Sequence, residues 1–335
     1  MLAGMQILHG PTLELGAAER GSVRRSMRPY LAASLQDDPR SFFDFVAQPP
    51  EPYDVITETE SRTIAGGVVE RRRFLSQYRP YHRDAALEQF AENDIIAVEH
   101  WAHRTVPPRG TVIALHGFAM GHPRLDARVL MASRWFALGF DVALVTLPFH
   151  GSRSPRKARF SGELFASWHV GRLNEAVRQA IHDVDLVSDW IARTTPGPIG
   201  IVGLSLGGYL AALYAGLRAD LAFVIAIAPP VCLWDLPLRL CRAAGVEPPV
   251  TRAQLERAYR IHSPLAHPVR VPRERLLLIA ALGDQIVPPG HATALWRHWH
   301  EPELVWLNGS HSTPFGRADA LARATEHLRR LGLVE

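Results

Sequence analysis

The chain has 335 residues, enough for one large α/β domain or two smaller ones, each with a hydrophobic core of its own. Hydrophobic residues make up 47% of the chain and charged residues 21%, which excludes a disordered protein or a coiled coil. The formal net charge is +4, and Lys157 is the only lysine among many arginines. The densest basic runs, at 71–73 and 153–159, lack the interleaved aromatic residues of a nucleic-acid site. We therefore expect solvated arginines and no nucleic-acid partner.

Compartment and membrane association follow from three further features. The longest apolar runs, at 221–230 and 276–282, are about half the roughly 20 residues that a membrane-spanning helix needs, so we expect no membrane span. The first ten residues lack the charged segment and the continuous apolar segment of a secretory signal. Two cysteines, Cys232 and Cys241, cannot form a disulfide framework. Together these features predict a cytoplasmic protein.

Residues 1–65 are predicted to form an N-terminal extension. They have helical potential at 23–35 and a proline-rich stretch at 48–52, but no motif that carries chemistry. Three roles stay open for this extension: it wraps the core, gates a pocket or pairs subunits in a homo-oligomer.

From residue 66 onward, apolar strand-like runs alternate with amphipathic helical segments. The expected strands are 68–78, 95–103, 111–116, 141–147, 199–203, 221–228, 276–282 and 303–307. The expected helices are 124–138, 172–193, 209–218, 290–300 and 317–331. This alternation predicts an α/β domain over 66–335 with a mostly parallel central sheet and helices on both faces. Residues 230–275 interrupt it after the sixth core strand, and we expect a cap insertion there.

The most informative segment is Gly203-Leu204-Ser205-Leu206-Gly207, which matches the pattern G-x-S-x-G between a predicted strand and a predicted helix. A serine at such a sharp turn adopts a strained backbone, and the flanking glycines avoid collisions with neighbouring chain. The following helix directs free N–H groups toward the serine, where they can stabilise an oxyanion.

A nucleophilic serine requires a histidine base that is oriented by a carboxylate. Asp284 follows the predicted strand 276–282, and His311 follows the predicted strand 303–307. Because the carboxyl ends of parallel strands lie at one edge of a sheet, we expect both residues near Ser205. Asp235, in the insertion, is the alternative acid.

In these motifs, and in their order along the chain, the sequence resembles the α/β-hydrolase fold, specifically its esterase and dienelactone-hydrolase-like members. The resemblance covers roughly residues 70–335 and includes His116-Gly117-Phe118 after an early strand. It implies Ser205 as nucleophile, Asp284 as acid and His311 as base. It also implies an oxyanion hole formed by the backbone N–H groups of Leu206 and Phe118. Pro148 and Ser152 depart from the esterase loop pattern, so the subfamily stays open.

Other residues are candidates for the surroundings of the pocket. His116, beside Gly117, is expected to brace the oxyanion loop rather than to transfer protons. His150 either braces a loop or lines the pocket, and Trp234 is expected to line it from the cap. No histidine pair with a nearby carboxylate and no cysteine cluster has the spacing of a metal site, so we expect neither metal nor cofactor.

The sequence therefore predicts a serine hydrolase that cleaves an ester, thioester or related acyl bond of a small-molecule substrate. Two alternatives remain. One is a catalytically silent binding protein with the same fold. The other is a different reaction of the same triad, such as the hydrolysis of a peptide or a carbon–carbon bond.

Overall fold

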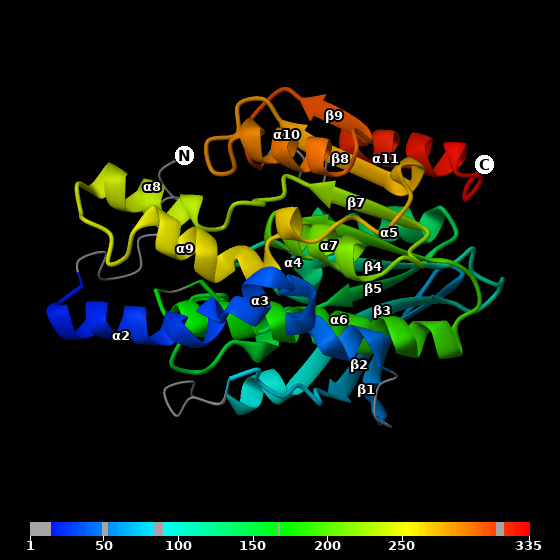
Figure 1. The fold of residues 1–335 in the computed structure, drawn as a ribbon. Helices are drawn as coiled ribbons and strands as arrows, with labels where there is room; N and C mark the ends of the chain where they lie inside the picture. Colours follow the sequence, from blue (N-terminus) through cyan, green and yellow to red (C-terminus); the bar gives the residue numbers. More distant parts are fainter. Residues whose placement is uncertain (1–14, 49–52, 83–89, 167, 313–317) are drawn as a thin grey trace.

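The computed structural model describes residues 15–48, 53–82, 90–166, 168–312 and 318–335. Within these ranges nine strands form one sheet in the order β1-β2-β3-β5-β4-β6-β7-β8-β9 (Figure 1). The strands are β1 (Val55–Ile64), β2 (Gly67–Leu75), β3 (Ile95–His103), β4 (Thr111–Leu115), β5 (Asp141–Val145), β6 (Ile199–Leu204), β7 (Phe223–Ile227), β8 (Leu276–Ala281) and β9 (Glu303–Leu307). All pairs from β5 to β9 are parallel, whereas β1, β2, β3 and β5 pair antiparallel. The predicted mostly parallel sheet is confirmed.

Helices cover both faces of this sheet, as expected. The helices beside the sheet are α4 (Pro123–Val129), α5 (Ala132–Ala137), α6 (Val170–Thr194), α7 (Leu206–Leu217), α10 (Pro289–His298) and α11 (Ala318–Arg330). In β4, Ile113 and Leu115 join the hydrophobic cluster that contains α6 and α7. Val112 and Ala114 join the opposite cluster, which contains α5 and α11. The central strands are continuous apolar runs because both of their faces are buried in this way.

The segment before the sheet packs along α6 (Figure 1, blue on green). Its elements are α2 (Ala17–Met27), η1 (Arg28–Leu31), α3 (Ala33–Asp37) and η2 (Pro39–Ala47). The Tyr30 hydroxyl donates to the buried carboxylate of Glu175 at 2.6 Å. One turn further along α6, the Arg178 guanidinium donates to the backbone oxygen of Phe42 and lies 5.5 Å from that ring. These buried contacts anchor the N-terminal segment to the domain.

The insertion between β7 and β8 contains α8 (Asp235–Ala244), α9 (Arg252–Tyr259) and three short 3-10 turns. Hydrogen bonds join it to the N-terminal segment, and each of the two segments supplies donors. Arg20 donates to the backbone oxygens of Glu247 and Pro248, and Gln36 donates to that of Arg257. In return, Arg260 donates to the backbone oxygen of Gln36. The two segments, more than 200 residues apart in sequence, therefore hold each other.

Two expectations differ from the structure. The expected boundary of the extension at residue 65 falls within a hairpin, because β1 pairs with β2 and already belongs to the sheet. The mostly polar sequence of β1 lacks the apolar pattern that would predict a strand. An edge strand buries few side chains, and Ile56 is 63% exposed. The single helix expected at 124–138 is divided into α4 and α5 at Met131, whose φ is 55°.

Some expectations fall partly or wholly outside the described residues. The first ten residues, on which the cytoplasmic prediction partly rests, lie outside them, as does most of the proline-rich stretch 48–52. Among the helices that the structure does describe, none combines the length and the apolar character needed to cross a bilayer.

Candidate active site

Ser205 lies at the turn between β6 and α7, as expected. Its φ of 51° and ψ of −112° are strained for a residue with a side chain, and its N–H donates to the Ile227 carbonyl at 2.7 Å. The glycines are needed because chain segments touch here. A Cβ on Gly203 would lie 2.0 Å from the backbone oxygen of Gly207. A Cβ on Gly207 would lie 2.1 Å from that of Leu115.

Asp284 and His311 meet Ser205 at the carboxyl edge of the sheet, where β8, β9 and β6 end. His311 Nε2 lies 3.1 Å from Ser205 Oγ, and His311 Nδ1 lies 2.7 Å from Asp284 Oδ2. A carboxylate only accepts hydrogen bonds, so Nδ1 carries the proton and the lone pair of Nε2 faces the serine. Asp284 is 3% exposed, and its other oxygen accepts the N–H groups of Ile286 and Val287 at 2.9 and 2.8 Å. The arrangement can withdraw a proton from the serine hydroxyl.

Asp235, the alternative acid, lies elsewhere. Its Oδ2 is 3.7 Å from Nε2 of His291 and 3.7 Å from the guanidinium of Arg239. Asp284 is therefore the carboxylate that contacts His311.

The loop after β4 lies directly against the serine. A Cβ on Gly117 would be 3.6 Å from both the Ser205 Cβ and the Leu204 carbonyl oxygen. Phe118 follows in this loop, and Ala119 has a φ of 62°. Leu206 is the first residue of α7, so its N–H belongs to the first turn of the helix, where N–H groups lack an intrahelical acceptor.

His116 connects this loop to the loop after β5. Its Nε2 accepts the Leu147 N–H at 3.0 Å, so the proton is on Nδ1, which donates to the Gly117 carbonyl at 2.8 Å. Burial lowers the pKa of His116 to about 4, which keeps the ring neutral. The second connection is Ser161, which accepts the Gly151 N–H and donates to the Met120 carbonyl.

His150 is fully buried between these loops and has ring contacts with His116 and Phe118. Its Nδ1 donates to the Pro148 carbonyl at 2.8 Å. Burial holds the pKa of His150 well below its ordinary value. Of the two interpretations of His150, these contacts favour the bracing of a loop.

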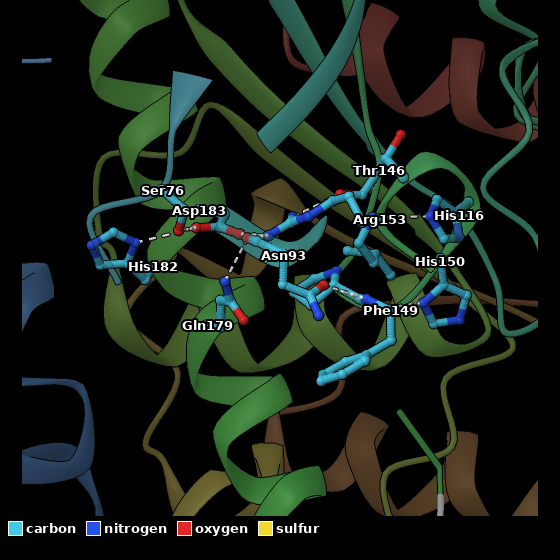
Figure 2. A network of polar contacts seen from close by, with 12 residues as sticks. Ser76, Asn93, His116, Thr146, Phe149, His150, Arg153, Gln179, His182 and Asp183 are labelled. Atoms are coloured by element: carbon cyan, nitrogen blue, oxygen red, sulfur yellow. Dashed lines mark hydrogen bonds and ion pairs between the residues drawn. The ribbon is translucent and has the colours of Figure 1, made fainter. Parts of the chain in front are cut away.

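A buried ion pair connects the loop after β5 to α6 (Figure 2). The Arg153 guanidinium donates to Asp183 at 2.6 Å and to the backbone oxygens of Thr146 and Asn93 at 3.0 and 2.7 Å. The Asn93 side chain accepts the N–H of Phe149, whose φ is 64°, at 2.7 Å. Arg153 is 1% exposed, so the expectation of a solvated arginine is wrong at this position. Position in a basic run could not reveal its partner Asp183, which comes from α6.

Trp234 lies half-buried just before α8, and the Arg252 guanidinium is 4.3 Å from the centre of its ring. This contact is within the insertion, so the assignment of Trp234 to the pocket stays a prediction. Among the described residues, no cluster of three or more histidine, cysteine or acidic side chains could hold a metal ion.

A mostly parallel sheet between two helical layers, with a serine at a strained strand–helix turn, defines the class of this protein: the chain belongs to the α/β-hydrolase superfamily. Residues 101–231 match the family described as alpha/beta hydrolase domain containing 18. An uncharacterized protein of Mycobacterium tuberculosis, Rv2627c in strain H37Rv, is 30% identical over 305 residues, which are 87% of this chain and 71% of that protein.

Solved structures share the fold at low sequence identity. Acetyl xylan esterase 1 from a Thermoanaerobacterium species has a TM-score of 0.62 at 14% identity, over 92% of this chain and 98% of that one. An acetyl xylan esterase from Paenibacillus sp. R4 has a TM-score of 0.60 at 14% identity, over 91% and 95% of the two chains. A peroxisomal α/β-hydrolase of Saccharomyces cerevisiae has a TM-score of 0.52 at 14% identity, over 85% and 91%.

Proposed function

We propose that this protein is a serine hydrolase that cleaves an ester, thioester or related acyl bond through an acyl-enzyme on Ser205. The observation that carries the proposal is the continuous hydrogen-bonded relay from Ser205 Oγ through His311 to Asp284, with distances of 3.1 and 2.7 Å. Such a relay activates a hydroxyl that is otherwise a weak nucleophile at neutral pH.

In the first stage, His311 Nε2 takes the proton of Ser205 as Oγ bonds to the acyl carbon. The carbonyl π electrons move to oxygen and form a tetrahedral oxyanion. His311 then gives its proton to the leaving oxygen or sulfur as the bond from the acyl carbon to that atom breaks. In the second stage a water molecule replaces the serine by the same sequence of proton transfers. Asp284 keeps Nδ1 protonated and stabilises the imidazolium that forms.

The oxyanion requires donors that are in place before the reaction. We assign this role to the backbone N–H groups of Leu206 and Phe118. The contact of Gly117 with Ser205 supports the assignment, because it brings the Phe118 loop to the serine. The bonds of His116 to Gly117 and Leu147 hold that loop against the loop after β5.

The insertion 230–275 is proposed to cap this site and to set the preference for the acyl or leaving group. Two proteins with this fold are acetyl xylan esterases. This likeness is one of fold and serves as a starting point for the substrate search. We therefore propose short acyl esters as the first class of substrate to screen.

The test is covalent labelling with a fluorophosphonate, in which the serine oxygen bonds to phosphorus and fluoride leaves. We expect one label per chain on Ser205, no label in Ser205→Ala, and a loss of ester turnover by several orders of magnitude in that variant. Intact mass and peptide mapping measure the first two, and circular dichroism confirms that the variant folds.

Ser133→Ala, at an exposed position on α5, is the matched control and should label normally. Turnover that persists in Ser205→Ala contradicts the assignment. A folded wild-type protein that takes no label would favour the catalytically silent binding protein instead.

A further inference from the structure

The loop that bears Asp284 is joined to the first helix of the insertion, α8 (Figure 1, where α8 is yellow and the loop leads into the orange α10). The Arg239 guanidinium spans this junction. Its Nη2 donates to the Gln285 carbonyl at 2.6 Å, and its Nη1 donates to the Ile286 carbonyl at 3.3 Å. A planar guanidinium that contacts two successive carbonyls restrains the orientation of both peptide groups.

The same loop holds the carboxylate with its N–H groups. The N–H of Ile286 and the N–H of Val287 both donate to Asp284 Oδ1, which leaves Oδ2 for His311. Ile286 therefore contributes to both interactions: its N–H binds Asp284 and its carbonyl binds Arg239. A rotation of these peptide groups would move the carboxylate oxygen that orients the histidine.

A second connection lies at the other end of the loop. His291, in the first turn of α10, accepts the Cys232 N–H through Nδ1 at 3.3 Å. Its Nε2 is 3.7 Å from Asp235, the first residue of α8, and Asp235 is also 3.7 Å from Arg239. The insertion thus contacts the loop at Gln285 and Ile286, and it contacts the start of α10 at His291.

We propose that Arg239 is a positioning residue for the relay: from the cap insertion it fixes the Asp284 loop, so that the carboxylate holds His311 in line with Ser205. This inference rests on the proposed function. Arg239 acts through the loop and does not touch the reacting atoms. Displacements of about 1 Å in a reacting group can cost on the order of a hundredfold in rate, so a distant restraint of this kind affects turnover. The cap then supports the chemistry as well as covering the site.

The experiment compares Arg239→Met, Arg239→Lys and Arg242→Met with the wild-type protein, using p-nitrophenyl acetate as substrate. Arg242 lies on the same helix, is exposed and is the matched control for loss of one positive charge. We expect Arg239→Met to lower kcat about 10- to 100-fold while KM changes less than about threefold. Arg239→Lys should recover part of kcat because an ammonium can still donate to one carbonyl. Arg242→Met should match the wild type.

A second readout does not depend on activity. The proton shared by His311 Nδ1 and Asp284 is expected to give a low-field signal in the proton NMR spectrum of the wild type. This signal should weaken or broaden in Arg239→Met, remain in Arg242→Met, and disappear in a His311→Gln reference.

Several results would overturn the inference. One is an unchanged kcat and an unchanged low-field signal in Arg239→Met. Another is a rise in KM alone, which would make Arg239 a residue of the substrate pocket only. Should Arg239→Met fail to fold, Arg239→Lys alone decides, since an unchanged kcat and signal in it contradict a need for two donors. Turnover that survives in Ser205→Ala, measured in parallel, would refute the proposed function, whereas the NMR comparison would still test the restraint on Asp284.

Discussion

Among the ion pairs of the described residues, Arg153–Asp183 is the most deeply buried, and both side chains are 1% exposed. Burial alone raises the pKa of Asp183, but the adjacent Arg153 charge and hydrogen bonds from His182 and Ser76 bring it below its ordinary value. Arg153 also donates to the backbone oxygens of Thr146 and Asn93, and the Asn93 side chain accepts the N–H of the strained Phe149. The ion pair therefore stabilises the loop after β5, whose Leu147 N–H donates to His116.

Removing only the arginine should be costly, because it leaves a buried carboxylate without its counter-charge. We expect Arg153→Met to lower the free energy of unfolding by about 3–5 kcal/mol. The double variant Arg153→Met/Asp183→Leu should lose less than this single variant, since no unpaired charge remains. Urea denaturation measures both, with Arg156→Met on the exposed side of the same loop as control. A loss below about 1 kcal/mol in Arg153→Met would contradict this account.

Among the larger elements, the N-terminal segment and the insertion hold each other through hydrogen bonds to backbone carbonyls. The donors Arg20 and Gln36 belong to the N-terminal segment, and Arg260 belongs to the insertion. Of the three roles considered for the N-terminal residues, these bonds favour wrapping, and the insertion is part of what the segment wraps.

Loss of these hydrogen bonds should make local unfolding of the insertion more frequent. Because each of these hydrogen bonds contributes about 1 kcal/mol, Arg20→Ala/Gln36→Ala should leave the fold intact but raise the frequency of local opening in the insertion. Hydrogen–deuterium exchange measured by mass spectrometry should become faster in α8 and α9 and stay unchanged in α7. Arg24→Ala, an exposed arginine of α2, is the control. Equal exchange in all three proteins would show that the insertion is held by other contacts.

At the scale of the whole molecule, burial leaves several histidines neutral. It lowers the pKa of His100 and His262 to about 3 and that of His116 and His267 to about 4. The pKa of His150 lies well below its ordinary value for the same reason. Unfolding returns these rings to water, where they take up protons below about pH 6.5.

The free energy of unfolding should therefore decrease as the pH falls. Where the unfolded state binds more protons than the folded state, stability rises with pH, at about 1.4 kcal/mol per pH unit for each proton. The contribution of these histidines is complete above about pH 6.5 and is lost as the pH falls toward 4. Three carboxyl groups with raised pKa values, Asp94, Asp126 and Asp185, act in the opposite direction but are fewer.

Urea denaturation between pH 7.5 and 5 measures this effect, and calorimetry in buffers of different ionisation enthalpy counts the protons taken up. We expect a steep loss of stability below pH 6.5 with net proton uptake on unfolding. A flat profile, or proton release, would be inconsistent with buried neutral histidines.

Local patterns in the sequence were sufficient for strands β2 to β9, the strand–helix turn at Ser205 and the three residues of the relay. An apolar run such as 111–115 indicates a strand that is buried on both faces. Glycines at 203 and 207 indicate a close approach of backbone segments that leaves no room for a Cβ. The order Ser205, Asp284, His311 followed from strand ends that gather at one edge of a parallel sheet. The strands and the turn could be predicted because each depends on residues close together in the chain. The relay could be predicted because each of its members follows the end of a strand that such a local pattern indicates.

Outside the relay, contacts between side chains far apart in the chain were not predicted from the sequence. The sequence placed Arg153 among solvated arginines, and it contained no local signal that Arg239 would contact Gln285 and Ile286 or that Arg20 would contact Pro248. The polar edge strand β1 was missed for a related reason, since its pairing with β2, rather than a buried face, makes it a strand. Such partners are selected by the packing of whole elements against one another, and a periodic pattern records that a residue is buried without recording what it is buried against.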